Sequence, residues 1–413
     1  MFGLVDGNNF YASCERAFQP ELRGQPVCVL SNNDGCVIAR SQECKDLGIA
    51  MGQPIHEVPL PLRRRLRIFS ANFGLYGDLS GRVVSILRDQ FARVEVYSID
   101  ESFVDFAGIR EDQREEMARQ VRARILQWVG IPCCVGIGPT KTLAKLANKL
   151  AKKTPHGVVT VLGGDPALER FPVEDVWGVG RKLTARLGAE GILTAADLAR
   201  ADPETLRARY GVVLARTQRE LQGIVCADVE ESEPDRKQIV VSCSFGREVV
   251  ALADLQQAVA TFAQRACEKL RSRSLQANGV WVWCNTNPFK PDAPQYHPSG
   301  AMPLIAPTSD TREVLRLAQH LVRAMYRQGY RHKKAGVGLL DLTRGDHQQG
   351  DLFAQAYPRS NSLNGGHRTS NARFGRGALW LASSAWRPRN RGMNQAAQSE
   401  RLTTSRGELP VAR

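Results

Sequence analysis

The sequence predicts an α+β protein of several domains, and three observations lead to this expectation. Its 413 residues exceed what a single hydrophobic core usually organises. Short apolar strands and amphipathic helices occur in two separate stretches, on either side of an acidic, proline-containing segment at residues 230–235. From residue 343 onward Gly, Ser, Asn, Gln and Arg predominate, which is typical of a poorly structured tail.

Composition restricts the class of protein. The chain is 43% hydrophobic and 24% charged, as soluble globular proteins are. Its net charge of +14 favours a polyanionic partner. No apolar run approaches the roughly 20 residues of a membrane span, so we expect no membrane partner. The ten cysteines form no C-x-x-C, which favours reduced, partly buried thiols over a disulfide framework.

Carboxylates follow two predicted strands of the first stretch. A strand over Phe2–Asp6 ends in one, and a hairpin over residues 94–106 carries Asp100 and Glu101 in its link, where a turn can direct both side chains to one site. Adjacent carboxylates repel each other unless a cation lies between them. Three of them on two strand ends suit a pair of Mg²⁺ ions in phosphoryl or nucleotidyl transfer. An exposed acidic turn is the simpler alternative.

The other elements of the first stretch follow from apolar periodicity and turn residues. Strands are predicted over residues 26–30, 36–39, 133–137 and 158–162, and helices over 41–47, 81–91, 111–129 and 140–153, with 57–76 irregular. The helix over 111–129 has an apolar stripe of Met117, Val121, Ile125 and Trp128. The helix over 140–153 has a basic row, Lys141, Lys145, Lys149 and Lys152, opposite its apolar side. This order indicates a ferredoxin-like domain interrupted by a small inserted domain.

A helical module over roughly residues 175–224 contains a G-x-G turn. Gly178 and Gly180 are followed directly by Arg181 and Lys182. Such a turn exposes backbone N–H groups that can bind phosphate without distinguishing base sequence. A lone G-x-G can equally be an ordinary helix connection, but the basic residues and a similar turn at residues 188–192 favour a helix-hairpin-helix.

Beyond residue 237 a second α+β unit of order βαββαβ is predicted. Its strands are expected over residues 239–243, 280–284, 301–305 (an edge strand) and 335–342, and its helices around 255–270 and 314–325. Arg331, Lys333 and Lys334 are among the basic residues of this unit. We expect a basic platform for a nucleic-acid duplex.

Five motifs are more specific than these patterns. They are FYASCE at residues 10–15, SNNDGCVIAR at 31–40, SIDE at 98–101, TKTLAK at 140–145 and DVWGVG at 175–180. Together they resemble Y-family translesion DNA polymerases, and are most similar to the UmuC-type catalytic subunit of DNA polymerase V and its plasmid-borne relatives. The resemblance spans roughly residues 1–345 and, more weakly, the tail. It implies error-prone, template-directed transfer of nucleotides from dNTP to a primer 3′-hydroxyl across damaged DNA. It also implies a role in an SOS-type damage response, in the cytoplasm at the nucleoid.

The resemblance also implies an order of domains. The expected ranges are 1–20 and 76–168 for a palm, 21–75 for inserted fingers, 169–230 for a helical thumb with the helix-hairpin-helix, 231–237 for a linker, 238–345 for a βαββαβ little finger, and 346–413 for a tail with clamp-binding and partner-binding segments.

Site residues are implied position by position. Asp6, Asp100, Glu101 and the carbonyl of Gly7 correspond to ligands of two Mg²⁺ ions, Tyr11 to a steric gate against ribonucleotides, and Lys45 and Lys152 to triphosphate contacts. Gly178, Gly180, Arg181, Lys182, Arg331, Lys333 and Lys334 are the expected DNA contacts. Lys45 replaces an Arg that many relatives carry, and Gly7 replaces a larger apolar residue. A Lys offers a point charge where Arg offers a planar fork.

The implied partners are primer-template DNA, dNTP, a sliding clamp, a UmuD-like dimer and a RecA-type filament. The clamp is expected at Gln349, Leu352 and Phe353, an apolar pair after a Gln in a polar tail. Two alternatives remain from the residues themselves. One is a catalytically silent DNA-binding scaffold, and the other is a palm-type cyclase, because such palms also pair metal-binding carboxylates.

Overall fold

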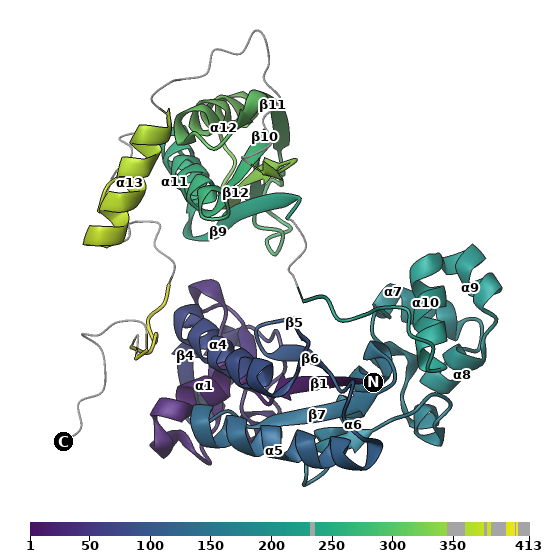
Figure 1. Ribbon diagram of the computed structural model, residues 1–413. Helices are drawn as coiled ribbons and strands as arrows, with labels where there is room; N and C mark the ends of the chain where they lie inside the picture. The colour runs from purple at the N-terminus through teal and green to yellow at the C-terminus, as the bar shows by residue number, and fades with distance from the viewer. Residues whose placement is uncertain (232–235, 345–359, 376–377, 381–393, 401, 404–413) are drawn as a thin grey trace. The chain divides into compact units, whose positions relative to one another are not determined.

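The computed structural model describes the chain except for residues 232–235, 345–359, 376–377, 381–393, 401 and 404–413 (Figure 1). It divides into two compact units, residues 1–233 with 395–413 and residues 234–394. Within the described residues, no helix combines the length and the apolar character needed to span a membrane.

The main sheet of the first unit has the strand order β5-β6-β1-β7-β8. These strands are β1 (Phe2–Gly7), β5 (Val94–Val96), β6 (Glu101–Asp105), β7 (Cys133–Gly138) and β8 (Val158–Thr160). One face, which includes Val5 and Val104, packs on α4 (Phe73–Gln90) and α5 (Glu111–Val129). The opposite face, which includes Leu4 and Phe103, packs on α6 (Lys141–Ala151).

The elements predicted around this sheet are largely confirmed, with two corrections. Helix α4 begins at Phe73, not at residue 81, because the Asn72 side chain caps it by accepting from the N–H of Leu75 at 3.2 Å. Trp128 was predicted on the apolar stripe of α5, and this is wrong, since it is 61% exposed. Val129 is buried in its place, because the stripe advances four residues at each step from Val121.

A smaller sheet has the order β3-β2-β4. It consists of β2 (Val27–Leu30), β3 (Val37–Arg40) and β4 (Arg67–Ser70), with α1 (Phe10–Phe18), α2 (Gln42–Asp46) and α3 (Leu60–Arg63) beside it in the sequence. Strand β4 lies in a segment that was predicted to be irregular, and this prediction is wrong there. The strand forms by parallel pairing with β2, a long-range contact that leaves no local pattern in the sequence. Cys28 and Cys44 form a disulfide, which corrects the expectation of reduced thiols for this pair. Strand β2 and helix α2 share one core, which the cysteine spacing does not reveal.

Four short helices follow the main sheet. They are α7 (Arg181–Gly188), α8 (Ala195–Arg200), α9 (Pro203–Tyr210) and α10 (Val212–Leu221). Short 3-10 turns occur at Pro20–Leu22, Asn32–Asp34, Ile55–Glu57, Pro166–Arg170 and Val173–Asp175. The helices share one hydrophobic cluster with Leu143, Leu146 and Ala147 of α6. Helix α6 therefore packs on the sheet with one side and on this helical group with another.

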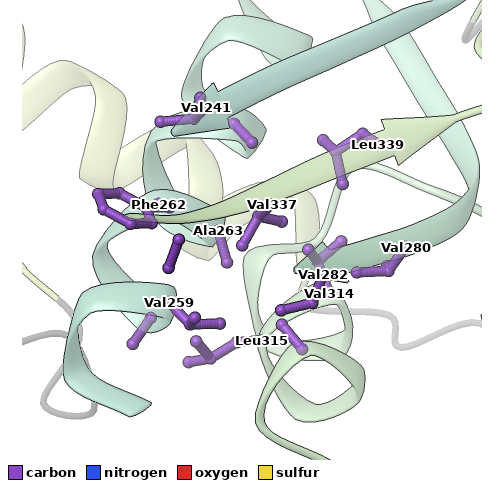
Figure 2. Packing of buried hydrophobic residues seen from close by; sticks show 14 of the residues in the cluster. Val241, Val259, Phe262, Ala263, Val280, Val282, Val314, Leu315, Val337 and Leu339 are labelled. Carbon is purple, nitrogen blue, oxygen red and sulfur yellow. The ribbon is translucent and has the colours of Figure 1, made fainter. Parts of the chain in front are cut away.

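The second unit is one antiparallel sheet with two long helices, and Figure 2 shows the apolar side chains between them. The strand order is β11-β10-β12-β9. The elements are β9 (Gln238–Val249), α11 (Leu252–Arg271), β10 (Leu275–Thr286), β11 (Ser299–Thr308), α12 (Thr311–Met325) and β12 (His332–Leu340), with β13 (Thr343–Arg344) paired to β10. The predicted succession of strands and helices, with residues 301–305 in an edge strand, is confirmed. Helix α13 (Ser360–Phe374) lies within the tail that was predicted to be poorly structured.

Candidate active site

The three predicted carboxylates come from neighbouring strands. Asp6 and Glu101 are directly opposite each other in the antiparallel pairing of β1 with β6. Side chains at directly opposed positions project from the same face of a sheet. Asp100 is the last residue of the link before β6, and its carbonyl accepts from the N–H of Gly7 at 2.9 Å. The structure thus brings together acids that are separated by more than ninety positions in the sequence.

Asp6 is the most deeply buried of the three carboxylates. It is only 7% exposed, and burial raises its pKa to about 6. Within this net value Lys152 opposes the effect of burial, and the charges of Glu101 and Asp100 add to it. A carboxylate that is both buried and close to two others is the arrangement in which a cation is needed.

The basic row of α6 supplies positive charge to this face. The Nζ of Lys152 lies 2.6 Å from Oδ2 of Asp6, and the Nζ of Lys145 lies 3.0 Å from Oε2 of Glu101. Asp100 accepts from the hydroxyl of Ser98 at 2.6 Å. The remaining two lysines pair likewise, Lys141 with Glu95 and Lys149 with Asp175. The spacing of the lysines predicted the row but not the acids that it faces.

Glycines in β7 allow α6 to lie close enough for these contacts. A Cβ atom at Gly136 would be 2.1 Å from the backbone N of Asn148 and 2.2 Å from the carbonyl oxygen of Ala144. The buried side chain of Asn148 then donates to the carbonyls of Leu4 and Cys134, at 3.1 and 3.0 Å. These two bonds tie α6 to β1 and β7 at the depth where its lysines reach the acids.

Lys145 is also enclosed by aromatic rings, a contact that was not foreseen from the sequence. Its ammonium lies 4.4 Å from the ring centre of Tyr97, 5.6 Å from that of Trp177 and 5.8 Å from that of Phe103. Trp177 donates from Nε1 to the hydroxyl of Tyr97 at 3.1 Å. Cation–π attraction adds to the ion pair and holds Lys145 beside Glu101.

The donors of this site fit a hard divalent cation in kind. Among the residues that the structure describes, no three His, Cys, Asp or Glu side chains converge closely enough to form a ready metal cage. The carboxylates of Asp6 and Glu101 instead pair with lysines. Carboxylate and backbone carbonyl oxygens are nevertheless the ligands that Mg²⁺ prefers. Burial is the main cause of the raised pKa of Asp6, and the charges of Glu101 and Asp100 add to it, so a cation would be favoured electrostatically here.

The ring of Phe10 explains why position 7, beside Asp6, is a glycine. A Cβ atom at Gly7 would be 2.8 Å from Cδ2 of Phe10, so the ring occupies the space that a larger residue would take. The neighbouring Tyr11 stacks on Tyr76, with ring centres 4.5 Å apart and planes inclined by 16°. Burial raises the pKa of the Tyr11 phenol, and the negative charge of Asp100 adds to this.

Arg40 and Lys152 act electrostatically on Lys45, and Lys152 also pairs with Asp6. The pKa of Lys45 is lowered by burial and then by the positive charges of Arg40 and Lys152. The negative charges of Asp46 and Asp6 act on the pKa of Lys45 in the opposite sense and raise it. Arg40 was not singled out from the sequence, although its position at the end of motif 31–40 was a usable signal. Its guanidinium donates to the carbonyl of Ile49 at 2.5 Å.

Comparisons with known proteins match this arrangement to one family. The models described as the impB/mucB/samB family and its C-terminal domain match residues 5–149 and 236–352. The chain is 42% identical to Protein UmuC of Salmonella typhimurium strain LT2, covering 99% of each chain. It is 41% identical to Protein ImpB of Salmonella typhimurium over 100% of both, and 42% identical to Protein MucB of Escherichia coli over 88% of this chain and 87% of that protein.

The chain belongs to the impB/mucB/samB family. It is a UmuC-like translesion DNA polymerase of the Y family. Its fold is also that of a solved Y-family DNA polymerase chimera of Dbh and Dpo4, with a TM-score of 0.69 at 20% identity, covering 83% of this chain and 100% of that one. DNA polymerase IV of Pelotomaculum thermopropionicum is 28% identical over 92% of this chain.

The other predicted contacts of this polymerase fall in three places. Gly178, at φ +89°, and Gly180, which precedes α7, have nothing within 4 Å of an added Cβ, so the turn is open. Arg181 and Lys182 are exposed at the start of α7.

In the second unit, Arg331 lies 3.9 Å from Glu248, Lys333 donates to the carbonyl of Phe245 at 2.6 Å, and Lys334 is exposed. The predicted clamp-binding residues Gln349, Leu352 and Phe353 lie outside the described residues.

Proposed function

We propose that Asp6, Asp100 and Glu101 form the centre at which this UmuC-like polymerase transfers a nucleotide from dNTP to a primer 3′-hydroxyl. The observation that carries the proposal is the register of Asp6 with Glu101 on adjacent strands, with Asp100 bonded through its carbonyl to Gly7. Lys152 pairs with Asp6, and the charges of Asp100 and Asp6 act on Tyr11 and Lys45, which supports a role of these three side chains in nucleotide binding.

The carboxylates and the Gly7 carbonyl would supply oxygen ligands for two Mg²⁺ ions. When bound, such ions lower the pKa of the attacking hydroxyl and neutralise the triphosphate. Asp6 contributes its buried carboxylate, and Asp100 presents its own from the turn, where Ser98 orients it. Lys145 orients Glu101 from the other side.

The basic cluster of Lys45, Lys152 and Arg40 is suited to the triphosphate. All three side chains are cationic, and Lys152 pairs directly with Asp6. Phosphate oxygens form shorter and stronger hydrogen bonds with charged donors than with neutral ones. Tyr11 would contact the sugar and exclude a 2′-hydroxyl by the position of its ring.

Primer-template DNA would be held by the open turn at Gly178 and Gly180, by Arg181 and Lys182, and by the basic residues of the second unit, Arg331, Lys333 and Lys334. We propose the division into palm, fingers, thumb and little finger at the limits given above. We further propose a sliding clamp at residues 349–353, and a UmuD-like dimer and a RecA-type filament as further partners at the nucleoid.

Single-turnover extension of a primer opposite an undamaged and an abasic template tests the proposal. Asp100→Ala should reduce the extension rate about a thousandfold or more, the effect of several kcal/mol of lost transition-state stabilisation. Asp89→Ala, which removes an exposed carboxylate from α4, is the matched control and should extend normally. Unchanged extension by Asp100→Ala, with DNA binding retained, would leave the DNA-binding scaffold as the better account.

A further inference from the structure

A late segment of the chain, residues 395–400, belongs to the first unit and pairs with β4. We call residues 395–400 the strap. The N–H of Ser70 donates to the carbonyl of Ala397 at 2.9 Å, and the N–H of Ala397 donates to the Ser70 hydroxyl at 3.1 Å. Ser70 and Gln398 form a parallel bridge. The strap thus lies at the β4 edge of the small sheet and is bridged to it at Ser70.

Asn72 joins the strap to the first turn of α4. Its Nδ2 donates to the hydroxyl of Ser399 at 3.0 Å and to the carbonyls of Ser399 and Glu400 at 3.2 Å. Its Oδ1 accepts from the N–H of Leu75, so one buried amide both caps α4 and holds the strap. The position of the strap and the start of α4 are therefore coupled.

The same serine reaches the support of Tyr11. The hydroxyl of Tyr76, on α4, donates to Oε1 of Glu15 at 2.6 Å, and the hydroxyl of Ser399 donates to the same oxygen at 3.2 Å. Glu15 is 1% exposed and Tyr76 is fully buried. Oε2 of Glu15 has no hydrogen-bond partner among the described residues, so Glu15 depends on these two hydroxyls.

Tyr11 and Glu15 are four residues apart on α1 and therefore lie on one side of that helix. Tyr76 contacts both of them, stacking its ring on Tyr11 and bonding its hydroxyl to Glu15. Phe73, from the same turn of α4, meets the Tyr11 ring edge-on at 5.9 Å. The wall behind Tyr11 thus consists of α4 residues whose helix the strap holds.

We propose that the strap, acting through Asn72, Ser399 and Glu15, positions Tyr11 and so sharpens the exclusion of ribonucleotides. The inference rests on the proposed gate role of Tyr11. A steric gate discriminates only as far as its ring resists displacement, and closely packed, hydrogen-bonded surroundings provide that resistance. The strap residues touch no substrate atom, so they are positioning residues.

Two variants of the full polymerase test the inference: Ser399→Ala, and a chain ending at residue 394. Ser399→Ala removes both hydrogen bonds of the hydroxyl, the one from Asn72 and the one to Glu15, and should raise kcat/KM for ribonucleotide insertion about fivefold or more. The shortened chain should show a larger increase. A chain ending at residue 403 retains the strap and is the matched control. The rate of dNTP insertion by Ser399→Ala should stay within about twofold of that of the parent protein. This distinguishes the proposal from a general loss of structure, which would lower both activities together.

A double-mutant cycle with Tyr11→Ala separates the two levels of the argument. If the strap acts through the gate, Ser399→Ala should add nothing once Tyr11→Ala has admitted ribonucleotides. If Tyr11→Ala leaves sugar discrimination intact, the gate role in the proposed function is wrong. If Tyr11→Ala abolishes discrimination while Ser399→Ala and the shortened chain retain it, only the role of the strap is overturned. Equal losses of dNTP and ribonucleotide insertion would also overturn it.

Discussion

Asp6 is the residue whose chemistry depends most on its surroundings. Burial beside Glu101 and Asp100 raises its pKa to about 6, from 3.8 for an exposed aspartate. The folded protein therefore binds a proton here more tightly than the unfolded chain does. Between roughly pH 4 and pH 6 this group makes the metal-free protein less stable as the pH rises. Ionised Asp6 is thus a local cost that a bound cation relieves.

Asp6→Asn should remove this cost. In the absence of Mg²⁺ at pH 7.5 we expect the variant to exceed the parent protein in free energy of unfolding by ~1–2 kcal/mol, after allowance for the lost Lys152 pair. At pH 4 the difference should vanish, because the parent carboxyl is then protonated. Urea denaturation at both pH values measures this, with the exposed Asp89→Asn as a control that should show no such pH dependence. A variant less stable than the parent at pH 7.5 would contradict the assignment, and primer extension should be lost in any case.

At the scale of elements, the seating of α6 on β7 determines the site. Its lysines reach Asp6 and Glu101 only because Gly136 leaves room for the backbone of the helix. Asn148 then fixes the helix to two strands. Strands and helices of this region could be predicted because each has its own apolar period. How closely α6 packs on β7 depends on Gly136, which has no side chain. Apolar periodicity does not reveal this close approach.

Gly136→Ala should therefore damage both stability and activity. The added methyl would have to displace the backbone of α6, since it would lie 2.1 Å from the N of Asn148. We expect a loss of ~3 kcal/mol or more in the free energy of unfolding, the upper range for overpacking, and a drop in extension rate. Gly81→Ala in α4 is the matched control, because nothing lies within 4 Å of its Cβ position. It should be neutral or stabilising by up to ~1 kcal/mol, as for Gly to Ala in a helix. Equal stability of the two variants would contradict the close approach.

At the scale of the whole molecule, net charge governs the interaction with DNA. The net charge of +14 favours binding to any polyanion. The carboxylates of Asp6 and Glu101 are a local concentration of negative charge, and they pair with Lys152 and Lys145. Attraction of this kind is sequence-independent and arises from the release of counterions. It should therefore depend strongly on salt.

We expect the logarithm of the association constant for a primer-template duplex to fall linearly with the logarithm of salt concentration, by about 0.9 per phosphate neutralised. Replacing Arg181 and Lys182 together by Ala should reduce the slope by about 1 to 2, if both contact phosphate. Arg110→Ala is a control, because this exposed arginine already pairs with Asp112. Fluorescence anisotropy across a salt series measures the slopes. An unchanged slope in the double variant would remove the open turn from the DNA interface.

The sequence by itself determined the family, the acidic strand ends, the position of Tyr11 and the lysine row, because motifs and apolar periods are local properties of the chain. Only the tertiary structure decided what these residues meet. The pairing of Lys145 with Glu101, the Tyr76 wall behind Tyr11 and the return of Ser399 to Glu15, 384 positions away, have no local signal. Such contacts depend on how the helices pack on the sheet and on the pairing of residues 395–400 with the edge strand β4. These are long-range outcomes of packing that no single stretch of sequence specifies.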